Sequence, residues 1–182
     1  HGGEYMTKKI MALLMVMLIA LTGCTTPQDD QAQDTPEVKQ NINLYYPNID
    51  DGKYYFIAAT LEAESEAEVK DNITELYKAN VLKGTGPVFS ENTQIKEINL
   101  DDEGILHIDF NDAFRYEMNA GSQYEAMILQ SITNTFGQYY ETDRVIVTVE
   151  GVLYESGHIL LEEGDFFETD YSNIAEVQQN IC

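Results

Sequence analysis

The sequence has little positive charge, two cysteines and no tryptophan. Of its 182 residues, 10 are Lys or Arg and 32 are Asp or Glu, which gives a formal net charge of −22. Nucleic-acid binding needs clustered Lys and Arg opposite the phosphates, so this composition excludes nucleic acid as a partner. The same charge predicts repulsion from anionic lipid surfaces, so attachment to a membrane requires an anchor that does not depend on electrostatic attraction.

Common catalytic motifs are also absent. The sequence has no G-x-S-x-G, H-E-x-x-H or C-x-x-C pattern. Of its three histidines, His1 stands before the first Met, which leaves His107 and His158 as the catalytic candidates. His107 alternates with strand residues and His158 follows a Gly turn. We therefore interpret them as sheet-face and loop residues, and expect no enzyme activity, no cofactor and no tightly bound small molecule.

One acidic turn partly matches a calcium-binding loop. Asn99, Asp101, Glu103 and Gly104 follow the early spacing of an EF-hand, but its twelfth position falls on Phe110, where a bidentate Glu belongs. The pattern therefore predicts no metal site. An extracytoplasmic solute- or cation-binding protein stays open as the alternative function, with weak surface binding of calcium.

No apolar run is long enough to remain in a membrane. The run from Ile10 to Leu21 has 12 residues, whereas a spanning helix needs about 20. Lys8 and Lys9 precede the run and small residues follow it. This layout is typical of a secretory signal, which we assign to residues 6–23.

The signal ends in Leu21-Thr22-Gly23-Cys24, which resembles the lipobox of bacterial lipoproteins. The resemblance implies that Cys24 carries a diacylglyceryl group and is the first mature residue. The two acyl chains then satisfy the requirement of stable anchoring for more than one lipid. We expect a lipid-anchored protein on the extracytoplasmic face of the cell membrane. The alternative is a secreted protein with an incidental Cys24, which could form a disulfide with Cys182.

The remaining chain has room for a single domain. Residues 1–5, before the expected start at Met6, are interpreted as a misplaced translation start or a cloning remnant. Residues 24–40 contain two prolines and several acids and predict a disordered tether after the lipidated Cys24. We place the folded domain at 41–171 and a flexible tail at 172–182.

Alternating apolar residues predict the strands, and helical spacing predicts two helices. A hairpin is expected from strands at 42–46 and 54–61, and a second one at 93–100 and 105–110. Capping boxes at Ser65/Glu68 and Ser122/Glu125 each precede an amphipathic helix, the second of which is expected to end at Gly137.

The last core strand is expected at 144–151, and residues 158–167 suggest a short closing strand or flap. The element order is therefore β-β-α-β-β-α-β. This order predicts an α+β two-layer sandwich, with two helices on one face of a mixed sheet of five to six strands.

The order of several segments resembles the GerMN domain, the sporulation and spore germination family. They are INLYYPN at 42–48, Gly84-Thr85-Gly86-Pro87, HIDFNDAF at 107–114, SQYEAMILQSITNTF at 122–136 and VIVTVEG at 145–151. The resemblance implies a non-catalytic envelope domain similar to ring-building motifs. Its expected partners are other envelope proteins or further copies of itself. Well-known members carry two such domains, whereas this chain has room for one.

The resemblance also implies structural roles for several residues. Gly86 and Pro87 are expected to stop the first helix and turn the chain, and Phe110 to pack in the core. Asp109 points away from the face of Phe110 and is expected to cap the turn that follows it. The adjacent Tyr139 and Tyr140 are the best candidates for an exposed aromatic recognition surface.

Overall fold

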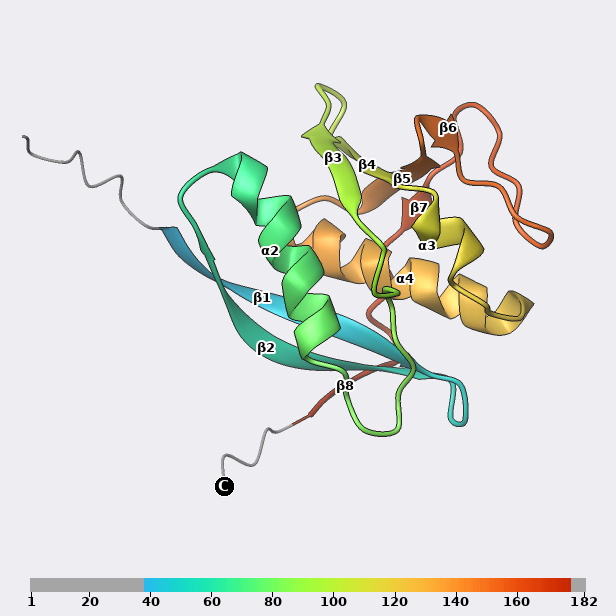
Figure 1. The fold of residues 1–182 in the computed structure, drawn as a ribbon, viewed down its shortest axis with the longest axis horizontal. Helices are drawn as coiled ribbons and strands as arrows, with labels where there is room; N and C mark the ends of the chain where they lie inside the picture. Colours follow the sequence, from blue (N-terminus) through green and yellow to red (C-terminus); the bar gives the residue numbers. More distant parts are fainter. Residues whose placement is uncertain (1–37, 178–182) are drawn as a thin grey trace, which may run out of the picture. The chain divides into compact units, whose positions relative to one another are not determined.

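The computed structural model describes residues 38–177, in which the helices are interspersed with groups of two or more strands (Figure 1). The signal, Cys24, most of the predicted tether and Cys182 lie outside these residues. None of the helices in the described part is long and apolar enough to cross a membrane. The elements are β1 (Val38–Asn48), β2 (Lys53–Ala63), α2 (Glu66–Ala79), β3 (Ile95–Leu100), β4 (Ile105–Phe110), α3 (Ala113–Tyr116), α4 (Ser122–Tyr139), β5 (Arg144–Val149), β6 (Val152–Leu153), β7 (Phe167–Glu168) and β8 (Ile174–Glu176).

The first hairpin forms a small sheet in the order β1-β2-β8. β1 and β2 pair in antiparallel register from Val38↔Ala63 to Asn48↔Lys53. The strand therefore begins before residue 41, where the sequence placed the start of the domain. β8 pairs in parallel with residues 54–56 of β2, so residues 174–176 are part of the fold and the prediction of a flexible tail is wrong for them.

The second sheet has the order β3-β4-β5-β6, and β7 also pairs with β5. β3 and β4 form the predicted antiparallel hairpin, while β4 and β5 run parallel. Parallel neighbours need a crossover connection, and α3 and α4 provide it. The predicted flap corresponds in part to β7 and to an isolated bridge between Glu155 and Leu160.

The α+β class is confirmed, but the expected single mixed sheet is divided into two. α2 contacts β2 and β3, and α4 contacts β1, β5 and β7, so each helix packs against both sheets. The hydroxyl of Thr135 on α4 accepts the backbone N–H of Tyr45 on β1 at 3.1 Å. Because α4 occupies this edge of β1, the hairpin does not join the second sheet.

The core contains a continuous row of aromatic rings, which we call the aromatic row. Successive ring centroids lie 4.2–5.9 Å apart, a range that favours tilted, edge-on and offset-stacked contacts. All six side chains are buried. The row links elements of both sheets and consists of Tyr46, Tyr77, Phe89, Phe110, Phe114 and Tyr154.

The helix ends differ from the predicted signals. Ser65 is the N-cap of α2, but its side chain makes no capping hydrogen bond, and Glu68 instead accepts the backbone N–H of Glu64 at 3.0 Å. α2 ends at Ala79, before it reaches Gly86. The backbone N–H and the side-chain amide of the next residue, Asn80, both donate to the carbonyl of Leu76. Local hydrogen bonds of a polar residue thus end the helix seven residues before Gly86, the predicted stop.

Two glycines serve close packing instead of ending helices. Gly137 lies inside α4, where an added Cβ would stand 2.7 Å from the carbonyl oxygen of Thr142. An added Cβ at Gly86 would stand 1.4 Å from the hydroxyl oxygen of Tyr124. The prediction that Gly137 ends the second helix is therefore wrong, because the helix continues to Tyr139.

Candidate functional site

The two histidines considered as catalytic candidates have different carboxylate partners. Nε2 of His107 on β4 lies 2.8 Å from Oδ2 of Asp101, and Nδ1 of His158 lies 2.8 Å from Oε2 of Glu125. No nucleophilic side chain has a hydrogen bond to either imidazole among residues 38–177. Each pair orients its imidazole ring through a hydrogen bond to a carboxylate.

The acidic turn that partly matched an EF-hand is closed by its own hydrogen bonds. Oδ1 of Asp101 accepts the backbone N–H groups of Glu103 and Ile105, each at 2.9 Å. Hydrogen bonds lower the pKa of the Asp101 carboxyl. The largest effect comes from the backbone N–H of Ile105 and the next from the ring of His107. Within the described part of the chain, no group of three or more His, Cys, Asp or Glu could hold a metal ion.

Asp109 stabilises a different turn from the one predicted. Its Oδ1 accepts the hydroxyl of Thr148 at 2.6 Å and the backbone N–H of Gly151 at 2.8 Å. The carboxylate therefore holds the tight β5–β6 turn, rather than the turn that follows β4. The parallel pairing of β4 with β5 places Asp109 beside Thr148, a long-range contact that local spacing does not reveal.

Glu125 is the functional candidate that the sequence missed. The residue is only 3% exposed, although its side chain was assigned to a capping box at the start of α4. Its carboxylate accepts the hydroxyl of Tyr154 at 2.7 Å and pairs with His158. Burial opposes its ionisation, but hydrogen bonds from Ser156, His158 and Tyr154 outweigh burial and lower the pKa of Glu125. Burial and the nearby carboxylate raise the pKa of Tyr154.

A groove runs between α2 and β3, and we call it the α2–β3 groove. It consists of two hollows of about 420 and 400 Å³ that share Lys70 and Lys96. Within the described part, β3 pairs with β4 alone, so its other edge faces this groove. Such an edge offers backbone groups to an added strand. The lining residues of the two hollows are Ala67, Lys70, Asp71, Thr74, Glu75, Lys78, Gln94–Leu100 and Tyr140.

The groove is close to neutral, unlike the chain as a whole. Lys70 pairs with Asp71 at 2.8 Å, and Lys78 pairs with Glu75 at 3.5 Å. Lys96 pairs with Glu150 at 2.5 Å. These exposed pairs contribute little to stability, but they reduce the repulsion that another acidic protein would meet at this surface.

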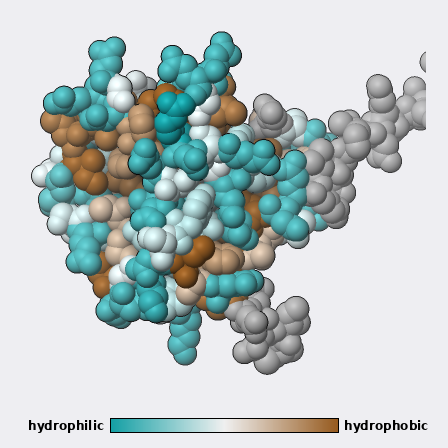
Figure 2. Space-filling view, turned by 180° about the vertical axis from the view of Figure 1, so that it is seen from behind, coloured by the Kyte–Doolittle hydropathy of each residue, from teal (hydrophilic) through white to brown (hydrophobic). Residues whose placement is uncertain are grey.

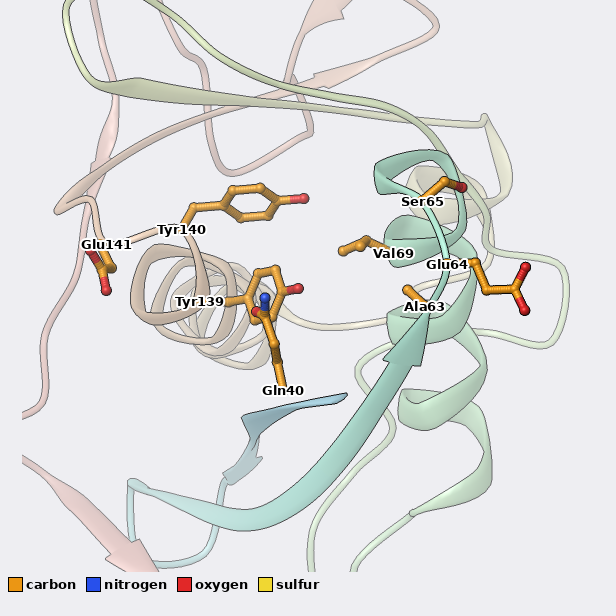
Figure 3. Close-up of a pocket in the computed structure, with 8 residues that line it drawn as sticks. All are labelled: Gln40, Ala63, Glu64, Ser65, Val69, Tyr139, Tyr140 and Glu141. Atoms are coloured by element: carbon orange, nitrogen blue, oxygen red, sulfur yellow. The ribbon is translucent and has the colours of Figure 1, made fainter. Parts of the chain in front are cut away.

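The predicted tyrosine pair lines a third hollow, which we call the tyrosine hollow. It has a volume of about 470 Å³, and Tyr140 also lines one hollow of the α2–β3 groove. Figure 3 shows the rings of Tyr139 and Tyr140 on one side of this hollow and Val69 opposite them on α2. The centroids of the two rings lie 5.0 Å apart. Both tyrosines are half-buried, so they are less exposed than the sequence suggested. Its lining residues are Gln40, Ala63, Glu64, Ser65, Val69, Tyr139, Tyr140 and Glu141.

The face that is seen when the view of Figure 1 is turned by 180° is largely hydrophilic. Figure 2 shows hydrophilic residues spread over this face, with separate hydrophobic patches between them. Exposed large hydrophobic residues are scattered over different elements, such as Leu100 on β3 and Val152 on β6. Single exposed apolar residues are normal on soluble domains. The groove and the tyrosine hollow are therefore the stronger candidates for protein contact.

Comparison with known proteins identifies a family for most of the domain. The family model described as "Germane: Sporulation and spore germination" matches residues 43–155. This range covers more than half of the chain. The search of curated proteins found no match.

Solved structures of GerMN domains also match part of this chain. The tandem GerMN domains of the sporulation protein GerM from Bacillus subtilis match at 20% identity with a TM-score of 0.46, over 75% of this chain and 45% of that one. The first GerMN domain of the same protein matches at 20% identity with a TM-score of 0.45, over 75% of this chain and 95% of that one. The chain thus spans less than half of the tandem-domain structure.

Proposed function

Because this chain belongs to the Germane family of sporulation and spore germination domains, we propose that it is a non-catalytic, lipid-anchored envelope protein. Its domain binds other proteins of the cell envelope, and it acts in sporulation or germination. The observation that carries this proposal is the open edge of β3 beside the α2–β3 groove.

The shape of the groove supports binding of an extended segment. A strand that enters between α2 and β3 can add to the edge of the second sheet through main-chain hydrogen bonds. Side chains of α2 then contact the other side of the added strand. Leu100, which is 46% exposed, offers an apolar contact at one end. The segment comes from an envelope protein or from a second copy of this chain.

The groove also lacks the charge that would repel an acidic partner. Lys70, Lys78 and Lys96 are three of the 10 basic residues of the whole chain, and all three line the groove. The carboxylates paired with these lysines offset their positive charge without making the surface strongly negative. An approaching envelope protein therefore meets less electrostatic repulsion here than the net charge of −22 suggests.

A proline at Leu100 tests strand addition. Backbone N–H groups of an edge strand point alternately toward its partner and toward the open edge. The N–H of Asp101 donates to the carbonyl of Ile105 on β4, so the N–H of Leu100 faces the open edge. Leu100→Pro removes this outward donor, and edge strands tolerate proline. Leu100→Ala is the matched control, because it shortens the side chain and keeps the N–H.

Capture from membranes of sporulating cells measures the effect. The wild-type protein and Leu100→Ala should recover the same envelope proteins at native expression levels, while Leu100→Pro should lose them. Circular dichroism of the purified variants checks that each remains folded. Equal capture by Leu100→Pro, or no captured protein with the wild type, would contradict docking at β3.

The anchor is tested separately at Cys24. The LTGC sequence at 21–24 and the 12-residue apolar run before it support acylation. The wild-type protein should fractionate with membranes and carry a lipid mass on an N-terminal cysteine, whereas Cys24→Ser should not. An unmodified Cys24 in the native product would refute the anchor and leave the docking proposal standing.

A second candidate function is an extracytoplasmic solute-binding lipoprotein. A separate polar cavity lined by Arg115 and His158 favours this function. Calorimetry with calcium tests the cation version of this alternative, which needs saturable heat. Residues 38–177 provide no cluster of ligands that supports calcium over other solutes.

A further inference from the structure

A polar cavity lies near the N-terminal end of α4, whereas the tyrosine hollow lies near the C-terminal end of the same helix. The cavity has a volume of about 620 Å³ and is formed by α3, the segment after it, the first turn of α4 and the segment after β6. Its lining residues are Arg115, Tyr116, Met118, Asn119, Ala120, Glu125, Tyr154, Glu155, Ser156, Gly157 and His158.

Two basic side chains, Arg115 and His158, line this cavity in a chain that has few of them. Arg115 is one of 10 basic residues, and His158 adds an imidazole. Hydrogen bonding of Nδ1 to Glu125 orients the ring of His158, whose side chain remains 47% exposed. Its Nε2 has no partner among the described residues, so it is available to a ligand.

The carboxylate of Glu125 does not cancel the attraction of the cavity for an anion. It is buried and already accepts hydrogen bonds from Tyr154 and His158. A carboxylate that is satisfied in this way repels a ligand less than an exposed one does. Since a carboxylate can only accept, Nδ1 of His158 carries a hydrogen in this pair. A second carboxylate at Nε2 favours the doubly protonated ring, in which both nitrogens donate.

Arg115 has donors that the described residues leave unused. Its Nη2 donates to the hydroxyl of Tyr116 at 2.9 Å, and its guanidinium lies 4.7 Å from the centre of that ring. The nearest carboxylate oxygen, on Asp112, is 3.9 Å away, which is too long for a hydrogen bond. The Nε atom is buried and has no hydrogen-bond partner among residues 38–177. A buried donor without an acceptor is unfavourable, so the site needs an acceptor.

We propose that this cavity binds a carboxylate group, which accepts hydrogen bonds from Arg115 and from Nε2 of His158. The planar guanidinium matches the geometry of a carboxylate. The volume of the cavity fits a small organic acid or the end of an acidic side chain. This inference does not depend on docking of a strand at β3.

Charge at the rim favours a carboxylate over phosphate. Asp112 lies beside Arg115, and the exposed Glu155 also lines the cavity. Both would repel a doubly charged phosphate more strongly than a singly charged carboxylate. Ser156 supplies no nucleophile to His158, because its Oγ accepts the backbone N–H groups of His158 and Ile159 and bonds to Glu125. The geometry therefore favours binding over catalysis.

Calorimetry on the full chain tests the proposal with four probes. N-acetylalanine offers a free carboxylate, and the peptide acetyl-Ala-Glu-Ala-amide offers only a side-chain carboxylate. Inorganic phosphate tests the other anion class, and N-acetylalanine amide is the neutral control. Arg115→Gln and His158→Gln each remove a donor, while Lys53→Gln removes a positive charge from the exposed end of the first hairpin.

At least one carboxylate probe should give saturable heat with the wild type, and the neutral amide should give none. Each cavity variant should weaken binding by roughly tenfold or more, the value of a charge-assisted hydrogen bond, and Lys53→Gln should not change it.

Tighter binding of the peptide indicates a protein side chain as the source of the carboxylate, and tighter binding of N-acetylalanine indicates a free solute. The proposal is overturned by no saturable heat with either carboxylate, by tighter binding of phosphate, or by unchanged binding in both cavity variants.

Discussion

The hydroxyl of Thr135 on α4 accepts the backbone N–H of Tyr45 on β1 at 3.1 Å, so a helix side chain takes the place of a neighbouring strand. The same hydroxyl bonds to the buried phenol of Tyr77 on α2. One threonine thus satisfies polar groups from two other elements inside the core. This arrangement explains how a buried helix can pack against a strand edge without leaving the N–H of Tyr45 unpaired.

Replacement of Thr135 by Val should therefore destabilise the domain. The substitution keeps the side-chain shape but leaves the N–H of Tyr45 and the hydroxyl of Tyr77 without this partner. We expect the free energy of unfolding in urea to fall by about 2–3 kcal/mol. Thr133→Val is the matched control, because the hydroxyl of Thr133 bonds only within α4, to the carbonyl of Leu129. Equal losses in both variants would contradict a special role for Thr135.

Gly86→Ala should also destabilise the domain, because of a steric clash. The new Cβ would meet the ring of Tyr124, whose hydroxyl donates to the carbonyl of Pro87 at 3.2 Å. Forced overpacking of this kind costs about 1–3 kcal/mol. Gly157→Ala is the control, since a Cβ at that position meets no atom within 4 Å. Thermal unfolding of the two variants measures the difference, and a Gly86→Ala variant as stable as the wild type would refute the close contact.

Truncation distinguishes the two parts of the predicted tail. Removal of residues 178–182 leaves β8 intact and should leave the free energy of unfolding unchanged within about 0.5 kcal/mol. Removal of residues 173–182 also deletes the parallel pairing with β2 and the 2.7 Å hydrogen bond from the amide of Asn173 to the carbonyl of Gly52. We expect this longer truncation to cost about 1–3 kcal/mol. If both truncations unfold at the same urea concentration as the full chain, β8 contributes nothing to stability.

Glu125→Gln should change how stability depends on pH. Because the pKa of Glu125 is lower in the folded state, the stabilisation from ionised Glu125 is fully present above its ordinary, unfolded-state pKa. This contribution disappears as the pH falls through the folded-state pKa. The groups that face Glu125 are Tyr154, Ser156 and His158.

Urea unfolding at several pH values between about 3 and 7 measures this effect. Near neutral pH the wild type should be more stable than Glu125→Gln by about 1–3 kcal/mol, the range for a buried, charged hydrogen-bond acceptor. The difference should shrink as the pH falls below the unfolded-state pKa of Glu125 toward its lower folded-state pKa. A difference that is independent of pH would contradict ionisation of Glu125 in the folded protein.

Local patterns in the sequence predicted the two hairpins and the two long helices. The alternation at 105–110 and the helical spacing at 122–136 arise from contacts within each element, and the structure contains both elements close to these bounds. The family resemblance is confirmed, and so is the α+β class. The division into two sheets was not predictable in this way, because it depends on α4 occupying the edge of β1.

The candidate sites depend on contacts between residues far apart in the sequence. Glu125 matched a capping box, but Gly121 is the N-cap, and the side chain of Glu125 reaches Tyr154 and His158 instead. Tertiary hydrogen bonds thus replaced the local one. The sequence contained one usable signal, a Glu inside an otherwise buried helical stripe, which requires buried partners. The α2–β3 groove carried no comparable signal, because its existence depends on which edge of β3 remains unpaired.

The aromatic row also gives the domain its own optical reporter. The chain contains no tryptophan and 12 tyrosines, and Tyr46, Tyr77 and Tyr154 are buried in contact with other rings. Fixed packing of such rings produces near-ultraviolet circular dichroism, which vanishes when side-chain order is lost while secondary structure persists. Since the row connects elements of both sheets, a single tyrosine spectrum registers loosening anywhere along it without an introduced label.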